Sequence, residues 1–142
     1  MDYRFKRCLE KRKLIKISVD ERRIKKEIDS AIYDLRMARD SLGGKDFKWA
    51  TVKAYYTFFH LGKAILFSKG YREKTHFCLM IGLKELLVDK GELDDIYLKN
   101  FEDAMNLREE ADYDFKFSEG GARETVSNAK DFLNKTKEIL GR

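Results

Sequence analysis

Several residue types are scarce or absent in this sequence. Neither proline nor glutamine occurs among its 142 residues, and only two histidines and two cysteines are present. Neither histidine lies in an HExxH or similar ligand pattern, so the sequence predicts no metal site. The phosphate-binding patterns GxxxxGK[ST] and GxGxxG are also missing. We therefore expect no cofactor of the P-loop or dinucleotide type, and no cofactor is otherwise indicated.

The two cysteines lie far apart in the sequence. Cys8 and Cys78 show no CxxC spacing, which predicts reduced cysteines in a cytoplasmic protein. Cys78 follows His76 by two positions, and such residues point to different faces of a helix; we interpret Cys78 as a small buried residue. No apolar run is long enough to span a bilayer, and the first residues lack the apolar core of a signal peptide. We expect no association with a membrane.

Charged residues are abundant and unevenly distributed. They make up 39% of the chain, beside 43% hydrophobic residues, so a folded domain with a core is expected. A Lys/Glu-rich chain without glutamine is typical of a thermophile. Residues 1–26 hold 11 Lys and Arg against 4 Asp and Glu, whereas the remainder holds 19 against 21. The basic character therefore belongs to the N-terminal part.

Residues 1–17 form a basic N-terminal segment with two interpretations. Such a segment can contact nucleic acid through phosphate groups. It can instead be a solvated amphipathic helix that packs on the rest of the domain. Phe5, Leu9 and Leu14 give the segment an apolar side, which favours packing.

Helical periodicity runs through most of the chain. Ser18 and Glu21 form a capping box, which predicts a helix from near Val19 to the glycines at 43 and 44. A nearly all-apolar helix follows from about Asp46 to Lys69. Thr75 can cap a third helix, which Gly91 ends. A fourth helix is expected over residues 94–113 and a fifth after a turn at 118–121, and residues 3–16 are expected to form a short basic helix.

These helices predict an all-α protein of one domain, residues 1–142. No segment alternates with period two, so no strands are expected. Short loops between four to five long helices, plus the short N-terminal helix, indicate an up-and-down antiparallel helical bundle. Apart from its tyrosines, the stretch between Trp49 and Phe67 has only three ionisable residues, Lys53, His60 and Lys63, so the helix over 46–69 should lie at the centre.

A permanent cation interrupts the apolar face of the fourth helix. Arg108 follows Phe101 and Ala104 on this face, and arginine must be paired or solvated because it does not lose its proton. Asp112 lies one turn further and can pair with it. The pair is either a structural bridge or a guanidinium retained for a phosphate. Tyr113 lies about 140° around the helix from Arg108, so the two should share a site only if the helix ends first or a second subunit contributes.

The remaining candidates are aromatic or imidazole side chains. Tyr56 and His60 are spaced i and i+4 and can touch, although His60 has the setting of an ordinary core histidine. His76 follows Thr75, the expected N-cap, where the backbone dipoles favour a neutral imidazole at an exposed helix end. The candidate ligand-binding residues are Arg108, Asp112, Tyr113, Tyr56, His60 and His76.

Three stretches in order resemble the HEPN superfamily (higher eukaryote and prokaryote nucleotide-binding). They are CLEKRKLIKIS at 8–18, DFKWATVKAYYTFFHLGKAILFSKGYREKTHFCLMIGLKELL at 46–87 and LREEADYDFKFSE at 107–119. More narrowly, the chain resembles the stand-alone prokaryotic HEPN proteins. The resemblance implies a helical bundle of four to five helices that forms a two-fold homodimer. It also implies a partner, a minimal nucleotidyltransferase encoded alongside, often as a toxin–antitoxin couple.

The resemblance also bears on catalysis. Nuclease members carry an Arg followed, at a spacing of four to six residues, by a His, and dimerisation forms their metal-independent RNA-cleaving site. Arg108 matches the arginine, but the corresponding histidine position holds Tyr113, and no histidine follows in the chain. A phenol with a pKa near 10 is a poor general base at neutral pH.

Three functions therefore remain open. The first is a HEPN-like protein that binds a nucleotide, RNA or a nucleotidyltransferase, as one half of a two-component, toxin–antitoxin-like system. The second is an active metal-independent endoribonuclease using Arg108, the only candidate catalytic residue. The third is a purely structural helical interaction module. We favour the first, in which the protein is non-catalytic or only weakly catalytic.

Overall fold

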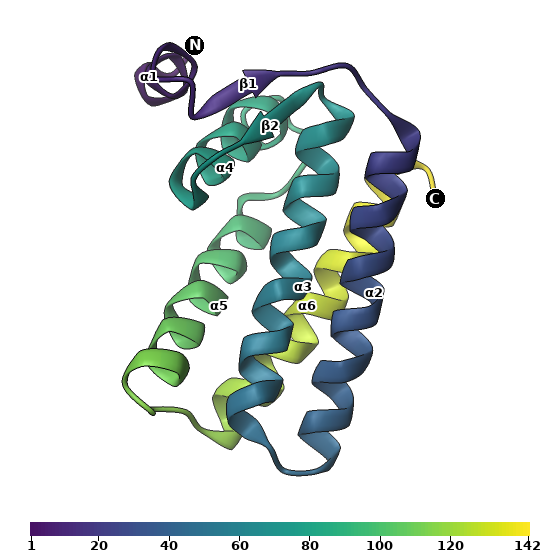
Figure 1. The fold of residues 1–142 in the computed structure, drawn as a ribbon, viewed down its shortest axis with the longest axis vertical. Helices are drawn as coiled ribbons and strands as arrows, with labels where there is room; N and C mark the ends of the chain where they lie inside the picture. The colour runs from purple at the N-terminus through teal and green to yellow at the C-terminus, as the bar shows by residue number, and fades with distance from the viewer.

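Four long helices form the main body of the protein. The computed structural model describes residues 1–142. Helices α2 (Glu21–Gly43), α3 (Phe47–Ser68), α5 (Asp95–Tyr113) and α6 (Glu119–Leu140) run up and down beside one another (Figure 1). We call these four helices the bundle. The predicted all-α up-and-down architecture is confirmed.

Helix α3 lies at the centre of the bundle, as predicted. It contacts α2, α5 and α6, and 13 of its 22 residues are buried. Phe58 of α3 stacks on Phe101 of α5 and Phe132 of α6, with ring centroids 5.5 and 5.4 Å apart. All three rings are fully buried. The nearly continuous apolar sequence of α3 is thus explained by neighbours on several sides.

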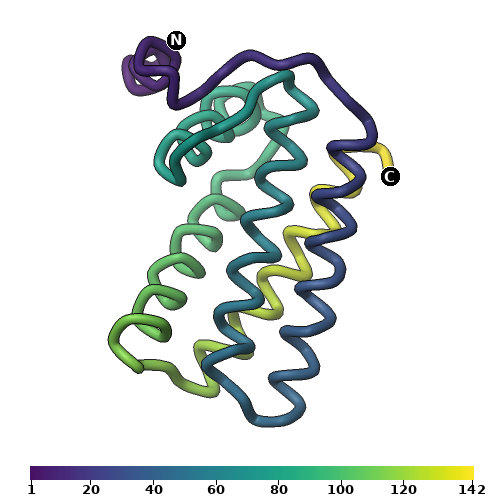
Figure 2. The backbone as a smooth tube through the Cα atoms, in the orientation of Figure 1, coloured from purple at the N-terminus to yellow at the C-terminus, as the bar shows by residue number.

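A smaller substructure lies across one end of the bundle. It consists of α1 (Tyr3–Glu10), β1 (Leu14–Lys16), β2 (Tyr71–Glu73) and α4 (His76–Leu83), and we call it the cap. A π-helical turn, η1 (Lys84–Val88), continues α4 toward α5. The tube in Figure 2 shows α1 outside the bundle, to the left of the upper end of α3.

The cap contains a small sheet, and the expectation of no strands was wrong. Strands β1 and β2 pair antiparallel, with Leu14 opposite Glu73 and Lys16 opposite Tyr71. Each strand has only three residues, too few to produce a recognisable alternation. The helix expected over residues 3–16 is shorter and ends at Glu10. Arg12 adopts a positive φ of 57°, which is not helical, and the chain then enters β1.

The cysteines are joined in the cap, which corrects the expectation of reduced thiols. A disulfide links Cys8 of α1 to Cys78 of α4, whose Cα atoms are 5.9 Å apart. Packing of α1 on α4 brings the two residues together across 70 positions of sequence, which spacing alone does not reveal. Phe5 and Leu14 are buried to 2% and 1% exposure. The predicted packing of the N-terminal segment through its apolar side is therefore confirmed.

The helix ends follow capping chemistry with two corrections. Asp20, not Ser18, is the N-cap of α2, and its side chain accepts a hydrogen bond from the backbone N–H of Arg22. Ser118 caps α6, so the expected turn at 118–121 is already the first turn of that helix. Thr75 caps α4 as predicted. None of the helices is long and apolar enough to cross a membrane.

Candidate functional site

Arg108 lies at the seam between α5 and α3. Its side chain is 20% exposed, and its Nη2 donates a hydrogen bond of 3.1 Å to the hydroxyl of Tyr56 on α3. The guanidinium carbon lies 5.6 Å from the ring centroids of both Tyr55 and Tyr56 and 5.7 Å from that of Tyr113. Three π faces and one phenolic oxygen thus surround a permanent cation. We call Arg108, Asp112, Tyr55, Tyr56 and Tyr113 the Arg108 cluster.

Asp112 is the ionic partner of Arg108, as the helical spacing predicted. Its Oδ2 lies 3.0 Å from the Arg108 Nε. The N–H is poorly aligned with this oxygen, so the buried Nε has no hydrogen-bond partner. Burial lowers the pKa of Arg108, but Tyr56, Asp112 and the other two tyrosines raise it, and the net direction is upward. The guanidinium is therefore cationic at any physiological pH, and its Nε is held by ionic contact with Asp112 rather than by a well-aligned hydrogen bond.

Tyr113 lies close to Arg108, although on an ideal helix the two side chains would point in directions about 140° apart. Tyr113 is the last residue of α5, so its side chain is not held by a following helical turn. This is the exception that the sequence left open, in which the helix ends first, and no second subunit is needed to bring the two residues together. The ring remains 74% exposed. It is therefore accessible to a ligand or to another protein.

Tyr55 and His76 extend the cluster toward the cap. Burial raises the pKa of Tyr55 to about 12, although the nearby Arg108 charge lowers it. The phenol is therefore neutral at physiological pH, and its oxygen lies 3.4 Å from Nδ1 of His76. Nε2 of His76 lies 3.1 Å from Glu102. A neutral imidazole with its proton on Nε2 satisfies both contacts. Because its side chain is only 17% exposed, His76 is not at an open helix end, contrary to expectation.

His60 belongs to a different seam. Its Nδ1 lies 2.6 Å from Glu27 and its Nε2 lies 3.5 Å from Asp34, both on α2. Burial raises the pKa of Asp34, while His60 and Lys53 lower it by a smaller amount. His60 is one helical turn from Tyr56 but is occupied by these carboxylates. It is therefore not part of the Arg108 cluster, although it is one of the six candidate ligand-binding residues.

An aromatic surface adjoins the Arg108 cluster. Phe115 is 74% exposed, Trp49 45% and Phe117 40%. The Lys48 ammonium lies 5.3 Å from the Trp49 ring and 5.8 Å from the Phe115 ring, which links α3 to the loop after α5. We call Trp49, Tyr113, Phe115 and Phe117 the aromatic patch. Exposed aromatic side chains that gather in one region are typical of interaction surfaces.

The structure brings four of the six sequence candidates together: Arg108, Asp112, Tyr56 and Tyr113. His76 is linked to them through Tyr55, which was not a candidate. The sequence signal that could have identified Tyr55 is the pair of adjacent tyrosines in AYYTFFH, of which only Tyr56 was a candidate. Nothing in the local sequence indicates that Glu102 contacts His76, since the two residues lie on different helices.

The structure is a helical bundle with a partly buried arginine near the end of α5, the third of its long helices. The profile of the HEPN domain matches residues 24–142, and the chain belongs to this family. The predicted family is therefore confirmed. The match begins inside α2, after the first part of the cap.

Two relatives come from Methanocaldococcus jannaschii. The protein named "Putative toxin MJ0605" is 30% identical over 114 residues, which cover 80% of this chain and 85% of the relative. The protein named "Putative toxin MJ0142" is 27% identical over 122 residues, which cover 84% of this chain and 83% of the relative. This chain thus resembles both relatives over most of their length.

Proposed function

We propose that this protein is a toxin-like HEPN protein that binds RNA through the Arg108 cluster. The observation that carries the proposal is the Arg108 guanidinium, a permanent cation that is partly exposed and lies beside the rings of three tyrosines. Such a cation can donate to a phosphate oxygen, and exposed Tyr113 can stack on a base. The names of the two relatives support the toxin-like character.

The test is a binding titration with labelled single-stranded RNA. Arg108→Ala should lower affinity at least tenfold, because it removes a charge-assisted contact. Arg108→Lys should not restore full affinity, since lysine lacks the planar guanidinium. Arg36→Ala, at an exposed position of α2, is the matched control and should bind like the unmodified protein. Unchanged RNA binding in Arg108→Ala would refute the proposal.

Metal-independent RNA cleavage is the second candidate function. It is favoured by Arg108, which matches the family's arginine, and by His76, whose imidazole is linked to the cluster through Tyr55. Against it, the family's histidine position holds Tyr113. Incubation with mixed RNA, with and without EDTA, distinguishes the two functions. We expect binding without cleavage; EDTA-resistant cleavage that Arg108→Ala abolishes would establish the ribonuclease instead.

We further propose that the active form is a homodimer joined through the aromatic patch. A two-fold interface there would cover the exposed rings beside Arg108 and bring two Arg108 clusters together. Light scattering at tens of micromolar should give twice the chain mass of 16.8 kDa. Phe115→Asp should give a monomer. Tyr33→Asp, at a 57% exposed tyrosine of α2, should remain dimeric; a monomeric unmodified protein would contradict this assembly.

The proposed partner is a minimal nucleotidyltransferase. Support comes from the family and from the relatives' names, since a toxin requires a neutralising component. Co-expression with a nucleotidyltransferase encoded by a neighbouring gene, followed by affinity purification, should recover both chains. Expression of this chain alone should slow growth, and co-expression should restore it. Recovery of this chain alone, with no effect on growth, would favour the purely structural helical module.

A further inference from the structure

A basic pocket lies in the cap, and its four cationic side chains come from residues that precede the start of the family match at residue 24. A pocket of about 490 Å³ opens between α1 and α4. Four cationic side chains, Arg4, Arg7, Lys11 and Lys13, line it from α1 and the turn that follows. Thr75 and Phe77 line it from α4, and the disulfide lies between the two walls.

The charges in this pocket are poorly compensated. No carboxylate lines it. Arg4 pairs with Asp2 at 3.1 Å, whereas Arg7 donates to the Tyr3 hydroxyl at 3.0 Å and forms no ion pair. Lys11 and Lys13 form no ion pair. A concave surface lined by several cations of one sign concentrates an anionic ligand.

Phe77 indicates which anion the pocket accepts. It stands at the start of α4, where every residue from Cys78 to Leu83 is buried, yet Phe77 is 58% exposed. A phenyl ring beside a row of cations is the combination that binds single-stranded nucleic acid, in which phosphates pair with the cations and a base stacks on the ring. Helix α1 directs its own apolar residues Phe5 and Cys8 inward, which leaves it without the apolar face that a membrane-surface helix requires.

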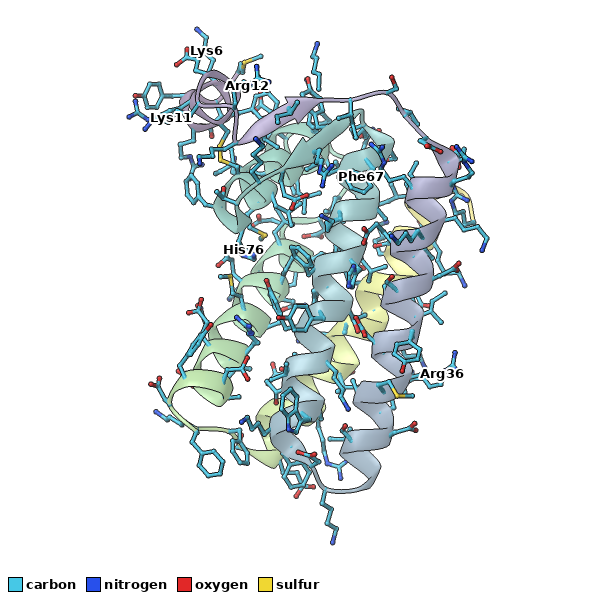
Figure 3. The ribbon with its side chains drawn as sticks, viewed as in Figure 1. Lys6, Lys11, Arg12, Arg36, Phe67 and His76 are labelled. Carbon is cyan, nitrogen blue, oxygen red and sulfur yellow. A yellow bond between two sulfur atoms is a disulfide. The ribbon has the colours of Figure 1, made fainter.

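A short chain of contacts connects the pocket to the Arg108 cluster. Thr75 and Phe77 flank His76, whose ring contacts Tyr55, and the Tyr55 ring lies 5.6 Å from the Arg108 guanidinium. Figure 3 shows His76 and Lys11 on the side of the molecule opposite Arg36. A single strand bound at both sites would follow this path.

We propose that the pocket between α1 and α4 binds the phosphodiester backbone of the same single-stranded RNA that reaches Arg108. The RNA ligand rests on the proposed function, but the site is a different one. Lys11 and Lys13 contact phosphates, and Phe77 stacks on a base. The disulfide fixes α1 against α4 and so holds the two walls of the pocket at a constant separation.

The experiment measures the affinity of labelled decauridylate by fluorescence anisotropy at several salt concentrations. The double substitution Lys11→Gln, Lys13→Gln should weaken binding about tenfold and reduce the salt slope by about 1.4, since each phosphate contact on a single strand contributes about 0.7. Phe77→Ala should weaken binding about fivefold or more without altering the salt slope. The matched control Arg36→Gln, Arg39→Gln removes two exposed cations of α2 and should leave both quantities nearly unchanged.

The outcomes separate this proposal from the function of Arg108. Loss of binding in Arg108→Ala but not in the Lys11/Lys13 variant would overturn the pocket and leave the proposed function intact. The reverse result would support the pocket and refute the Arg108 assignment. If the Lys11/Lys13 and Arg36/Arg39 variants lose RNA affinity equally, the loss reflects only the lower net charge of the protein, and the proposal is overturned.

Two further probes test the identity of the ligand. Millimolar AMP or inorganic phosphate should compete weakly, because each supplies only one phosphate group; competition as strong as that of the RNA would overturn the assignment to a strand. Anionic phosphatidylserine vesicles should bind no better to the unmodified protein than to the Lys11/Lys13 variant. Vesicle binding that depends on these lysines, with RNA binding unchanged, would identify a membrane surface instead.

Discussion

The bundle and the cap are stabilised in different ways. The bundle buries long apolar faces that repeat along each helix, and its aromatic stack joins three helices through Phe58, Phe101 and Phe132. The cap has two three-residue strands, two short helices and a disulfide that closes 70 residues of sequence. Periodic burial therefore stabilises the bundle, whereas a few contacts between distant residues hold the cap. The cap should be the part that opens first.

The largest expected effect is in the bundle. Phe101→Ala removes a fully buried ring that contacts Phe58, Phe132 and the His76 ring. Such a truncation costs about 3–5 kcal/mol of unfolding free energy. Urea denaturation followed by circular dichroism would measure it. A loss near zero would contradict the view that this stack is the centre of the fold. Exposed Tyr33→Ala on α2 is the control and should cost far less.

The disulfide tests whether the cap depends on its cross-link. Cys8→Ser should lower the unfolding free energy by about 2–4 kcal/mol if the cap and the bundle unfold together. If the cap opens separately, the loss appears as faster amide exchange in α1 and β1, with α3 still protected. Hydrogen exchange distinguishes these cases. An effect spread evenly over α3, α5 and α6 would show that the cap is not a separate unit.

Sequence periodicity predicted the bundle because each long helix carries its own local signal, namely the spacing of its apolar residues and a capping residue at its N-terminus. Gly62 adds a constraint of a different kind: a Cβ there would lie 2.9 Å from the Phe101 ring, a contact that spacing does not reveal. The cap escaped prediction because β1 pairs with β2, and Cys8 with Cys78, across most of the chain. At the site, Asp112 was found from an i, i+4 spacing. The roles of Tyr55 and Glu102 depend on contacts between helices, for which a single sequence carries no local signal.

The seam between α3 and α5 belongs to the bundle but is held by polar contacts. Complete burial of the Arg108–Asp112 pair would make its disruption cost several kcal/mol. The two side chains are 20% and 21% exposed, so Asp112→Ala should cost about 1–2 kcal/mol, between exposed and buried pairs. A double-mutant cycle with Arg108→Ala isolates the pair energy. A coupling near zero would mean that the tyrosines alone hold Arg108.

The smallest expected effect is at the seam between α2 and α3, where burial raises the pKa of Asp34 against the smaller opposing effects of His60 and Lys53. Because the folded state binds this proton more tightly than the unfolded state, the stability due to neutral Asp34 is present below pH 3.8 and is lost as pH rises through the raised pKa. Asp34→Asn should therefore raise the unfolding free energy at pH 7 by up to about 0.5 kcal/mol and have less effect at pH 3. Urea titrations at both pH values would measure the difference, with exposed Asp40→Asn as the control. If Asp34→Asn is less stable than the unmodified protein at pH 7, the attraction between Asp34 and His60 outweighs the cost of burying the carboxylate. The charges of Asp34 and His60 would then stabilise the seam between α2 and α3.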